Sequence, residues 1–223
     1  ANKDDDTVGI FSINATTGVL TSVGTSLTQS QPASVAISVG NAAVSFVPKF
    51  TYAANNDTSD VTAKSFNATT GEQTTVAGSP FGGGTLPVIG ALNPAGTLLY
   101  VPNAGSFDIS AWSVNATTGA LTTVAGSPFA GGISPFAAAV DPSGRFLLVA
   151  NAGSGDVSIY SIAGSGVLAE VAGSPFAAGI GPFSVAVAPN GSYVYVLNTN
   201  SENLSVYSLS ASTGALTEVA GSP

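Results

Sequence analysis

One phrase recurs along this chain and constrains its fold more than any other feature. TTVAGSPFGGG at residues 74–84 returns as TTVAGSPFAGG at 122–132 and EVAGSPFAAG at 170–179, and the chain ends within EVAGSP at 218–223. The glycines of the four GSP triplets, spaced by 48, 47 and 48 residues, are Gly78, Gly126, Gly173 and Gly221. Periods of this size indicate propeller blades or the units of a solenoid.

Each repeat contains four strand-like segments separated by turn residues. In the last repeat they are the segments 183–189, 193–198, 204–209 and 215–220. Short apolar runs joined by Asn-Gly and Thr-Gly pairs are hairpin signals, and no segment keeps the 3.6-residue period of an amphipathic helix. Four antiparallel strands in about 47 residues predict an all-β fold of β-propeller blades.

The third segment of the repeat carries an aromatic residue at one position, and its neighbours are apolar. The aromatic residues of this column are Phe11, Trp112, Tyr160 and Tyr207. Because successive strand residues point to opposite faces, both faces are apolar, as a blade between two other blades requires. We therefore interpret the column as interblade packing rather than as a ligand site. The second repeat departs from the pattern, with Lys64 in the column and five inserted residues near 39–47.

The segments PFAAAVDPSGRFLLVAN (135–151) and PFSVAVAPNGSYVYVLN (182–198), with the GSPF phrases, carry a family resemblance. They resemble the lactonase-type β-propellers, a family of bacterial 6-phosphogluconolactonase-like and YVTN-repeat proteins, over essentially the whole chain. The resemblance implies a seven-bladed ring. It is specific for the fold and weak for function, because function lies in sites placed on a fold.

The chain is predicted to be a single propeller domain over residues 1–223 with an incomplete ring. The parts are a half blade at 1–30 and four full blades at 31–84, 85–132, 133–179 and 180–223. Three interpretations stay open: a fragment of a longer ring, an open arc, or a polymer in which neighbouring chains supply the missing strands. An isolated arc exposes apolar blade faces and strand edges, so closure or assembly is favoured.

Composition excludes several classes of function. The chain has 12 acidic and 4 basic residues, a net charge of −8, and no His, Cys or Met. Nucleic acid is excluded as a partner because phosphate binding needs clustered Lys and Arg. Without His, the commonest general base and metal ligand is missing. The basic residues are scattered through the repeats, so no catalytic residue is assigned and no enzyme is favoured.

The low charge of this β-rich chain, 7% of residues, favours an extracellular or cell-surface location, with a signal peptide removed before this numbering begins. No apolar run reaches the ~18 residues of a membrane helix.

Acidic residues cluster between the second and third segments of several repeats. Asp4, Asp5 and Asp6 are the best candidates for Ca²⁺, which binds six to eight oxygen ligands. Elsewhere one acidic residue recurs at a single turn position, which favours turn capping over metal binding. No other cofactor is predicted.

The sequence NATTG recurs at Asn14, Asn67 and Asn115, and each copy is an N-glycosylation sequon. Glycans there would decorate one rim of the ring. Asn to open a turn and Gly to supply a positive φ are also what a turn needs, and we favour the turn.

Together these features predict a non-catalytic, extracellular structural or interaction module that self-assembles into oligomers or filaments through open blade edges. One alternative is a lactonase-like hydrolase whose active site lies partly outside these residues. Another is a carbohydrate- or ligand-binding propeller, which would expose aromatic residues at its loop tips. Phe81, Phe129 and Phe176 stand near turns, but their recurrence after Pro predicts staples between blades.

Overall fold

The computed structural model describes residues 7–13, 20–27, 32–36 and 49–223, with side chains from residue 49 onward. Every element in these ranges is a β-strand, so none of the described segments is a helix long enough to cross a membrane. The insertion expected near 39–47 lies outside the described residues. The predicted all-β fold is confirmed.

The full blades are four antiparallel sheets whose strands pair in chain order. The first contains β3 (Pro32–Ala36), β4 (Phe50–Asn55), β5 (Asp60–Phe66) and β6 (Gln73–Thr75). The second contains β8 (Ala91–Leu92), β9 (Leu98–Asn103), β10 (Asp108–Val114) and β11 (Leu121–Thr123). The third contains β13 (Pro135–Val140), β14 (Phe146–Asn151), β15 (Asp156–Ile162) and β16 (Leu168–Glu170). The fourth contains β18 (Pro182–Val187), β19 (Tyr193–Asn198), β20 (Asn203–Leu209) and β21 (Leu216–Glu218).

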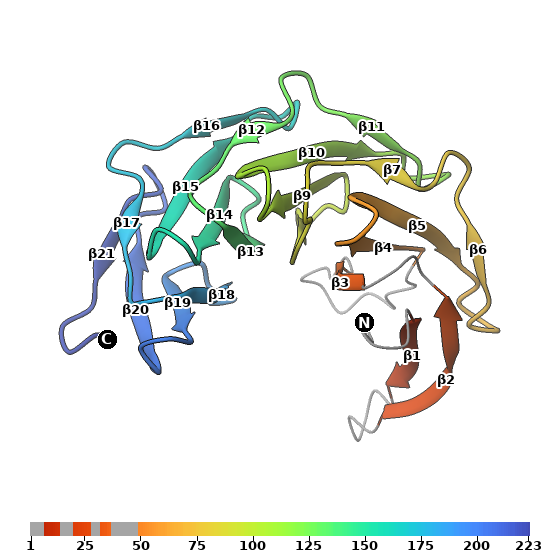
Figure 1. Ribbon diagram of the computed structural model, residues 1–223, viewed down its shortest axis with the longest axis horizontal. Coiled ribbons are helices and arrows are strands. Elements are labelled where there is room, and N and C mark those ends of the chain that lie inside the picture. Colours follow the sequence, from red (N-terminus) through yellow and green to blue (C-terminus); the bar gives the residue numbers. More distant parts are fainter. Residues whose placement is uncertain (1–6, 14–19, 28–31, 37–48) are drawn as a thin grey trace.

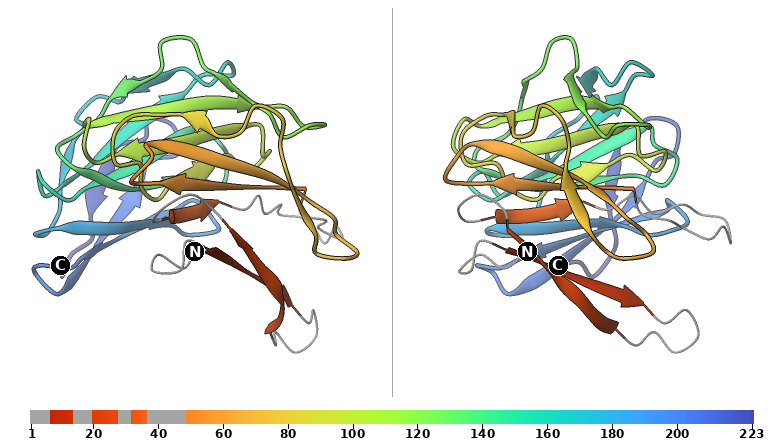
Figure 2. Two further views of the ribbon diagram at one scale, coloured as in Figure 1. Left: turned by 45° about the vertical axis from the view of Figure 1, so that its right-hand side comes forward. Right: turned by 90° about the vertical axis from the view of Figure 1, so that its right-hand side faces the viewer.

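A separate hairpin, β1 (Thr7–Ile13) with β2 (Leu20–Leu27), precedes the first blade. The blades follow one another around an open arc, with the short strands β6, β11, β16 and β21 outside (Figure 1). The fourth blade stands at one end of the arc and the β1–β2 hairpin at the other. Seen from the side, the strands of the blades run across the thickness of the arc (Figure 2). The predicted propeller architecture, with an unclosed ring, is confirmed.

The repeated GSP phrase forms a kink within each outer strand. In the second blade, β11 pairs with β10, the chain turns through a cis Ser127–Pro128 bond, and β12 (Phe129–Ala130) pairs with β10 again. At the gap, the Ser127 hydroxyl accepts a hydrogen bond from the Ala111 amide at 2.9 Å. Ser79, Ser174 and Ser222 do the same in the other blades. Proline therefore does not end the ladder in the first three blades, because a serine hydroxyl fills the gap and pairing resumes beyond it.

The phenylalanine after each of these prolines lies between blades. Phe81, Phe129 and Phe176 are half-buried, and each packs against one of the three buried apolar clusters that lie between adjacent blades. The prediction that these side chains staple neighbouring blades is confirmed.

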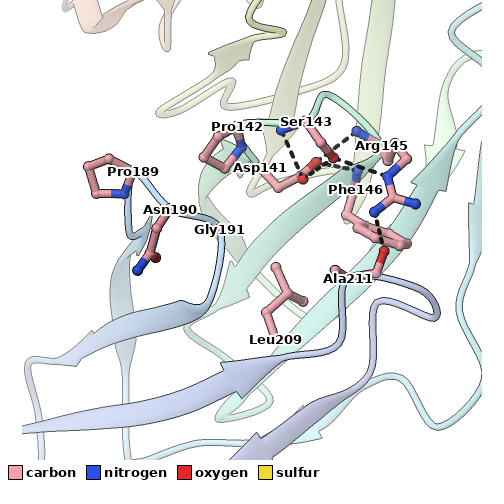
Figure 3. Close-up of a pocket in the computed structure, with 10 residues that line it drawn as sticks. All are labelled: Asp141, Pro142, Ser143, Arg145, Phe146, Pro189, Asn190, Gly191, Leu209 and Ala211. Carbon is pink, nitrogen blue, oxygen red and sulfur yellow. Dashed lines mark hydrogen bonds between the residues drawn. The ribbon is translucent and has the colours of Figure 1, made fainter. Parts of the chain in front are cut away.

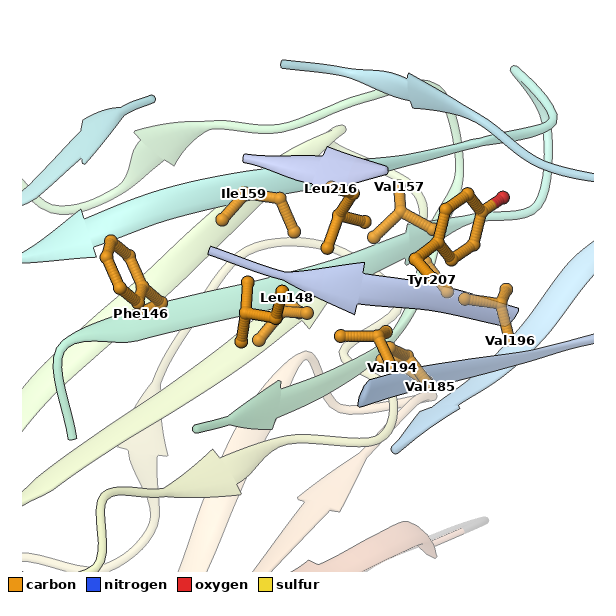
Figure 4. Packing of buried hydrophobic residues seen from close by; sticks show 12 residues of the cluster. Phe146, Leu148, Val157, Ile159, Val185, Val194, Val196, Tyr207 and Leu216 are labelled. Carbon is orange, nitrogen blue, oxygen red and sulfur yellow. The ribbon is translucent and has the colours of Figure 1, made fainter. Parts of the chain in front are cut away.

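Most of the core lies between blades. Between the third and fourth blades, Phe146 and Leu148 from β14 face Val194 and Val196 from β19 (Figure 4). Tyr207, a member of the aromatic column, belongs to the same cluster, and its counterparts Trp112 and Tyr160 are buried in the other two. The interpretation of the column as interblade packing is confirmed for these three residues, while the side chain of Phe11 lies outside the described part of the chain.

Tyrosine hydroxyls add directed bonds to these apolar interfaces. Tyr52 on β4 donates to the carbonyl of Gly119 in the next blade at 2.8 Å, and Tyr100 on β9 donates to Gly166 at 3.0 Å. Burial raises the pKa of both hydroxyls above the usual value. The neutral hydroxyl is therefore part of the folded interface.

The third residue after the repeated phenylalanine is always glycine, for a steric reason. A Cβ at Gly84 would lie 2.6 Å from the amide of the buried Asn103. A Cβ at Gly82, two residues earlier in the same phrase, would meet nothing within 4 Å. The other phrases carry alanine at the position of Gly82 and retain glycine at the position of Gly84.

We predict that Gly84→Ala lowers the free energy of unfolding by about 2 kcal/mol, because the methyl group overpacks the Asn103 amide. Gly82→Ala is the matched control and should change it by less than about 1 kcal/mol. Urea denaturation of both variants measures the difference, and equal effects would contradict the steric explanation.

We also predict that stability falls as the pH rises above about 10, where tyrosine ionises in the unfolded chain but the raised pKa keeps Tyr52 and Tyr100 neutral in the folded one. Below that pH their contribution is fully present. Tyr52→Phe with Tyr100→Phe should lower stability at pH 7 by about 1 kcal/mol per lost bond and flatten the alkaline decline. Thermal unfolding from pH 7 to 11 tests this, and an unchanged alkaline slope would contradict it.

Candidate functional site

A buried asparagine ends the second strand of each full blade and organises the turn that follows. In the third blade, Asn151 Nδ2 donates to Asp156 at 2.6 Å and to the Ser158 hydroxyl at 2.9 Å. The equivalent groups are Asn55 with Asp60 and Thr62, Asn103 with Asp108 and Ser110, and Asn198 with Asn203 and Ser205. The recurrent aspartates thus accept a hydrogen bond from the side-chain amide of a buried asparagine. The turn-capping interpretation anticipated this in part, since it placed these residues in a turn but expected them to bind backbone amides.

The calcium candidates Asp4, Asp5 and Asp6 lie outside the described residues. Within the part of the chain that the structure describes, no three His, Cys, Asp or Glu side chains gather closely enough to hold a metal ion. The calcium site at Asp4–Asp6 stays a prediction.

The sequons at Asn67 and Asn115 are exposed turn residues, while Asn14 lies outside the described part of the chain. The side-chain oxygen of Asn67 accepts hydrogen bonds from the amides of Thr69 at 2.9 Å and Thr70 at 3.1 Å. Asn115 makes the same bonds to Thr117 and Thr118. The asparagine therefore closes the turn, and this explains its recurrence without a glycan.

A pocket of about 270 Å³ lies between the third and fourth blades (Figure 3). It is bounded by the turn between β13 and β14, the turn between β18 and β19, and the end of β20. Its polar residues are Asp141, Ser143, Arg145 and Asn190, and its apolar wall includes Phe146 and Leu209.

The ionisable groups of this pocket are engaged in holding the turns. Asp141 is buried and accepts hydrogen bonds from the amides of Arg145 and Phe146, both at 2.7 Å, and from Ser143. Arg145 donates to the Ala211 carbonyl of the next blade and to the Ser143 hydroxyl. Lys49 makes the corresponding bond from the first blade to Ala116 in the second, at 3.1 Å.

Sequence reasoning treated Arg145 as one of several scattered cations and missed its contact with the neighbouring blade. Their shared position in the repeat could have revealed this contact, because Lys49 and Arg145 both directly precede the second strand of their blades. Asp141 was missed as well, although the DPSG turn that contains it is visible in the sequence. Both residues bond to the Ser143 hydroxyl, and Arg145 also ties its turn to the neighbouring blade.

Two other features of the described blades are a second pocket and a pair of aromatic rings. A smaller pocket of about 150 Å³ lies between the first and second blades, lined by Gly83 and Gly84 on one side and by Ser110 and the buried Trp112 on the other. On the inner strands, the rings of Phe136 and Phe183 stack with centroids 4.1 Å apart. These surfaces are apolar or carry hydroxyl groups, and neither brings an acid and a base together.

The fold is an all-β propeller of four-stranded blades with an unclosed ring. Residues 127–223 match the family model "Lactonase, 7-bladed beta-propeller". A comparison with curated proteins found no match. Together with the solved structures below, the family match confirms the resemblance to lactonase-type propellers.

Solved structures share the fold at low sequence identity. The periplasmic gluconolactonase of Pseudomonas aeruginosa aligns with a TM-score of 0.74 and 20% identity, covering 96% of this chain and 62% of that one. A Bacteroides uniformis protein provisionally called a 6-phosphogluconolactonase aligns at 0.74 and 18%, covering 96% and 64%. A protein of unknown function from Desulfotomaculum acetoxidans aligns at 0.76 and 20%, covering 96% and 62%. The present chain therefore spans less than two thirds of these structures.

We predict that Asp156→Asn changes the free energy of unfolding by less than about 1 kcal/mol, because Asn203 fills the same role in the fourth blade. Asn151→Leu should cost about 3 kcal/mol, since it leaves the buried Ser158 without this partner and crowds Gly132. Urea denaturation of both variants, with and without added Ca²⁺, tests the structural role. A large, Ca²⁺-dependent effect of Asp156→Asn would contradict it.

Proposed function

We propose that this chain is the larger part of a lactonase-type propeller that hydrolyses sugar lactones, with part of its active site outside the described residues. The observation that carries the proposal is the match of residues 127–223 to the lactonase propeller family. The structural similarity to a periplasmic gluconolactonase supports the same class of substrate.

The described blades supply the scaffold rather than the catalytic groups. Hydrolysis of a cyclic ester requires a donor that polarises the carbonyl and a base that activates water. Asp141 and Arg145 are committed to turns and to the neighbouring blade. The apolar rings of Phe136 and Phe183 would form part of the wall against which a sugar ring lies. The polarising donor and the base then come from further blades.

The test measures hydrolysis of glucono-δ-lactone and of 6-phosphogluconolactone by the complete natural polypeptide. The reaction is monitored through the protons it releases, which are titrated at constant pH. We expect turnover above the spontaneous rate by the complete polypeptide and none by residues 1–223 alone. Absence of turnover by the complete polypeptide on both lactones would contradict the proposal.

A second candidate is the non-catalytic structural or interaction module, self-assembling through open blade edges. It is favoured by the exposed apolar side chains on the fourth blade and by the engagement of the ionisable groups in the pocket. Sedimentation velocity of residues 1–223 over a hundredfold concentration range distinguishes the two. Growth of the particle with concentration supports assembly, whereas lactone turnover by the complete polypeptide supports the hydrolase.

Both candidates place the protein outside the cytoplasm, in the periplasm or beyond it. The low charge of the chain and the periplasmic location of the Pseudomonas aeruginosa gluconolactonase support this part of the proposal.

A further inference from the structure

The pocket of about 150 Å³ between the first and second blades has one wall made of backbone alone. Gly82, Gly83 and Gly84 line that side, and Ser110 and Trp112 line the other. A Cβ at Gly83 would lie 3.5 Å from both Ser110 Oγ and Trp112 Cη2, so it would occupy the space between them without a clash. The third phrase of the repeat carries alanine at this position, so the pocket depends on a glycine that the fold does not require.

A tyrosine hydroxyl takes the equivalent position at the next two interfaces. Tyr160 Oη donates to the Ala130 carbonyl of the preceding blade at 3.0 Å, and Tyr207 Oη donates to the Ala177 carbonyl at 2.6 Å. Burial raises the pKa of Tyr160, and the adjacent Ser158 hydroxyl partly offsets this rise. The tyrosine hydroxyl thus lies between a serine of its own blade and a carbonyl of the preceding blade.

The second blade has no such hydroxyl, because tryptophan replaces the tyrosine. Trp112 belongs to the same aromatic column as Tyr160 and Tyr207. The counterpart of Ala130 is Gly82, since each pairs with the aspartate that begins the third strand of its blade. Within the described chain, Trp112 donates no hydrogen bond to the Gly82 carbonyl. The acceptor that the tyrosine uses elsewhere therefore faces a pocket.

Ser110, the counterpart of Ser158, supplies a donor to the same pocket. It is buried, and its Oγ accepts hydrogen bonds from Asn103 Nδ2 at 2.9 Å and from the Gly84 amide at 3.2 Å. These two bonds occupy both lone pairs of the oxygen, so its O–H can only donate. Ser110 and the Gly82 carbonyl together offer the donor and the acceptor that the tyrosine hydroxyl joins in the other blades.

The rest of the lining is uncharged and carries further hydroxyl groups. In the third blade the Ser174 hydroxyl donates to Glu170 at 2.9 Å. The corresponding residues of the second blade are Ser127 and Thr123, which line the pocket and bring no charge to it. A few placed polar groups orient a ligand in such a site, and these favour a neutral ligand with several hydroxyl groups. A cavity of about 150 Å³ holds a six-membered ring.

We propose that this pocket binds a neutral sugar ring, one hydroxyl of which takes the place of the tyrosine hydroxyl. That sugar hydroxyl accepts a hydrogen bond from Ser110 and donates one to the Gly82 carbonyl. Ser127 and Thr123 bind a neighbouring hydroxyl, and the six-membered ring of Trp112 contacts C–H groups of the sugar. The inference does not rest on lactone hydrolysis, because a sugar without a lactone carbonyl meets the same groups.

Tryptophan emission reports on this pocket, because Trp112 lines it and is the only tryptophan among the 223 residues. The complete natural polypeptide is titrated with glucose, galactose, mannose and xylose up to about 50 mM, which covers weak binding of so small a ligand. Maltotriose and cellotriose are tested as well, because tighter binding of a trisaccharide assigns the site to the end of a polysaccharide rather than to a free sugar. Phenol tests an apolar ring with a single hydroxyl.

Two variants close the pocket by different means. Gly83→Ala places a methyl group between Ser110 and Trp112, and Trp112→Tyr restores the hydroxyl of the third and fourth blades. Gly164→Ala is the matched control, because its Cβ would meet nothing within 4 Å in a turn of the third blade. Circular dichroism checks that the variants are folded, and calorimetric titration measures binding to Trp112→Tyr, which lacks the reporter.

We expect at least one of the sugars to change the tryptophan emission until it saturates. Gly83→Ala retains Trp112 and should remove this change, and both pocket variants should weaken sugar binding at least about tenfold. Gly164→Ala should alter the affinity less than about twofold. Three results would overturn the proposal: no binding of any of these sugars, sugar binding that survives in either pocket variant, or binding of phenol alone.

Discussion

The structure depends on the burial of apolar faces between consecutive blades. A single four-stranded sheet of this repeat has two apolar faces, so it cannot hide both by folding alone, and each blade is stable only beside another. The three clusters between the described blades are built from equivalent positions, with β9, β14 and β19 each presenting residues to the preceding blade. This one requirement explains both the apolar composition and the shortage of charge.

Directed contacts give the apolar stacking its register. Tyr52 and Tyr100 bond to turn carbonyls of the next blade, and Lys49 and Arg145 reach carbonyls in the equivalent turn of the blade that follows each of them. Within each blade, the GSP serine satisfies the amide that the kinked outer strand leaves open. Apolar contact alone would tolerate sliding of one blade over another, whereas these bonds form at only one offset.

The use of polar side chains in these structural contacts explains why few of them in the described blades are available to bind or react with a ligand. The charged and polar groups inside them are used to close turns and to tie one blade to the next, as at Asp141, Asp156 and Arg145. A propeller scaffold of this kind leaves function to residues that the repeat does not require. In the hydrolase that we propose, the apolar inner wall near Phe136 would be combined with groups from outside the described residues.

The sequence by itself determined the repeat, the four strands of each blade and the packing role of the aromatic column. These follow from periodicity and alternation, which depend only on local geometry, and the observed strands reproduce them. It also indicated the turn role of Asn67 and Asn115. Only the tertiary structure decided that the outer strand resumes beyond its proline, that Arg145 reaches Ala211, and that Gly84 lies against Asn103. Those contacts join residues that are distant in the chain or in different blades, and their partners are set by how the blades stack, which no local pattern records.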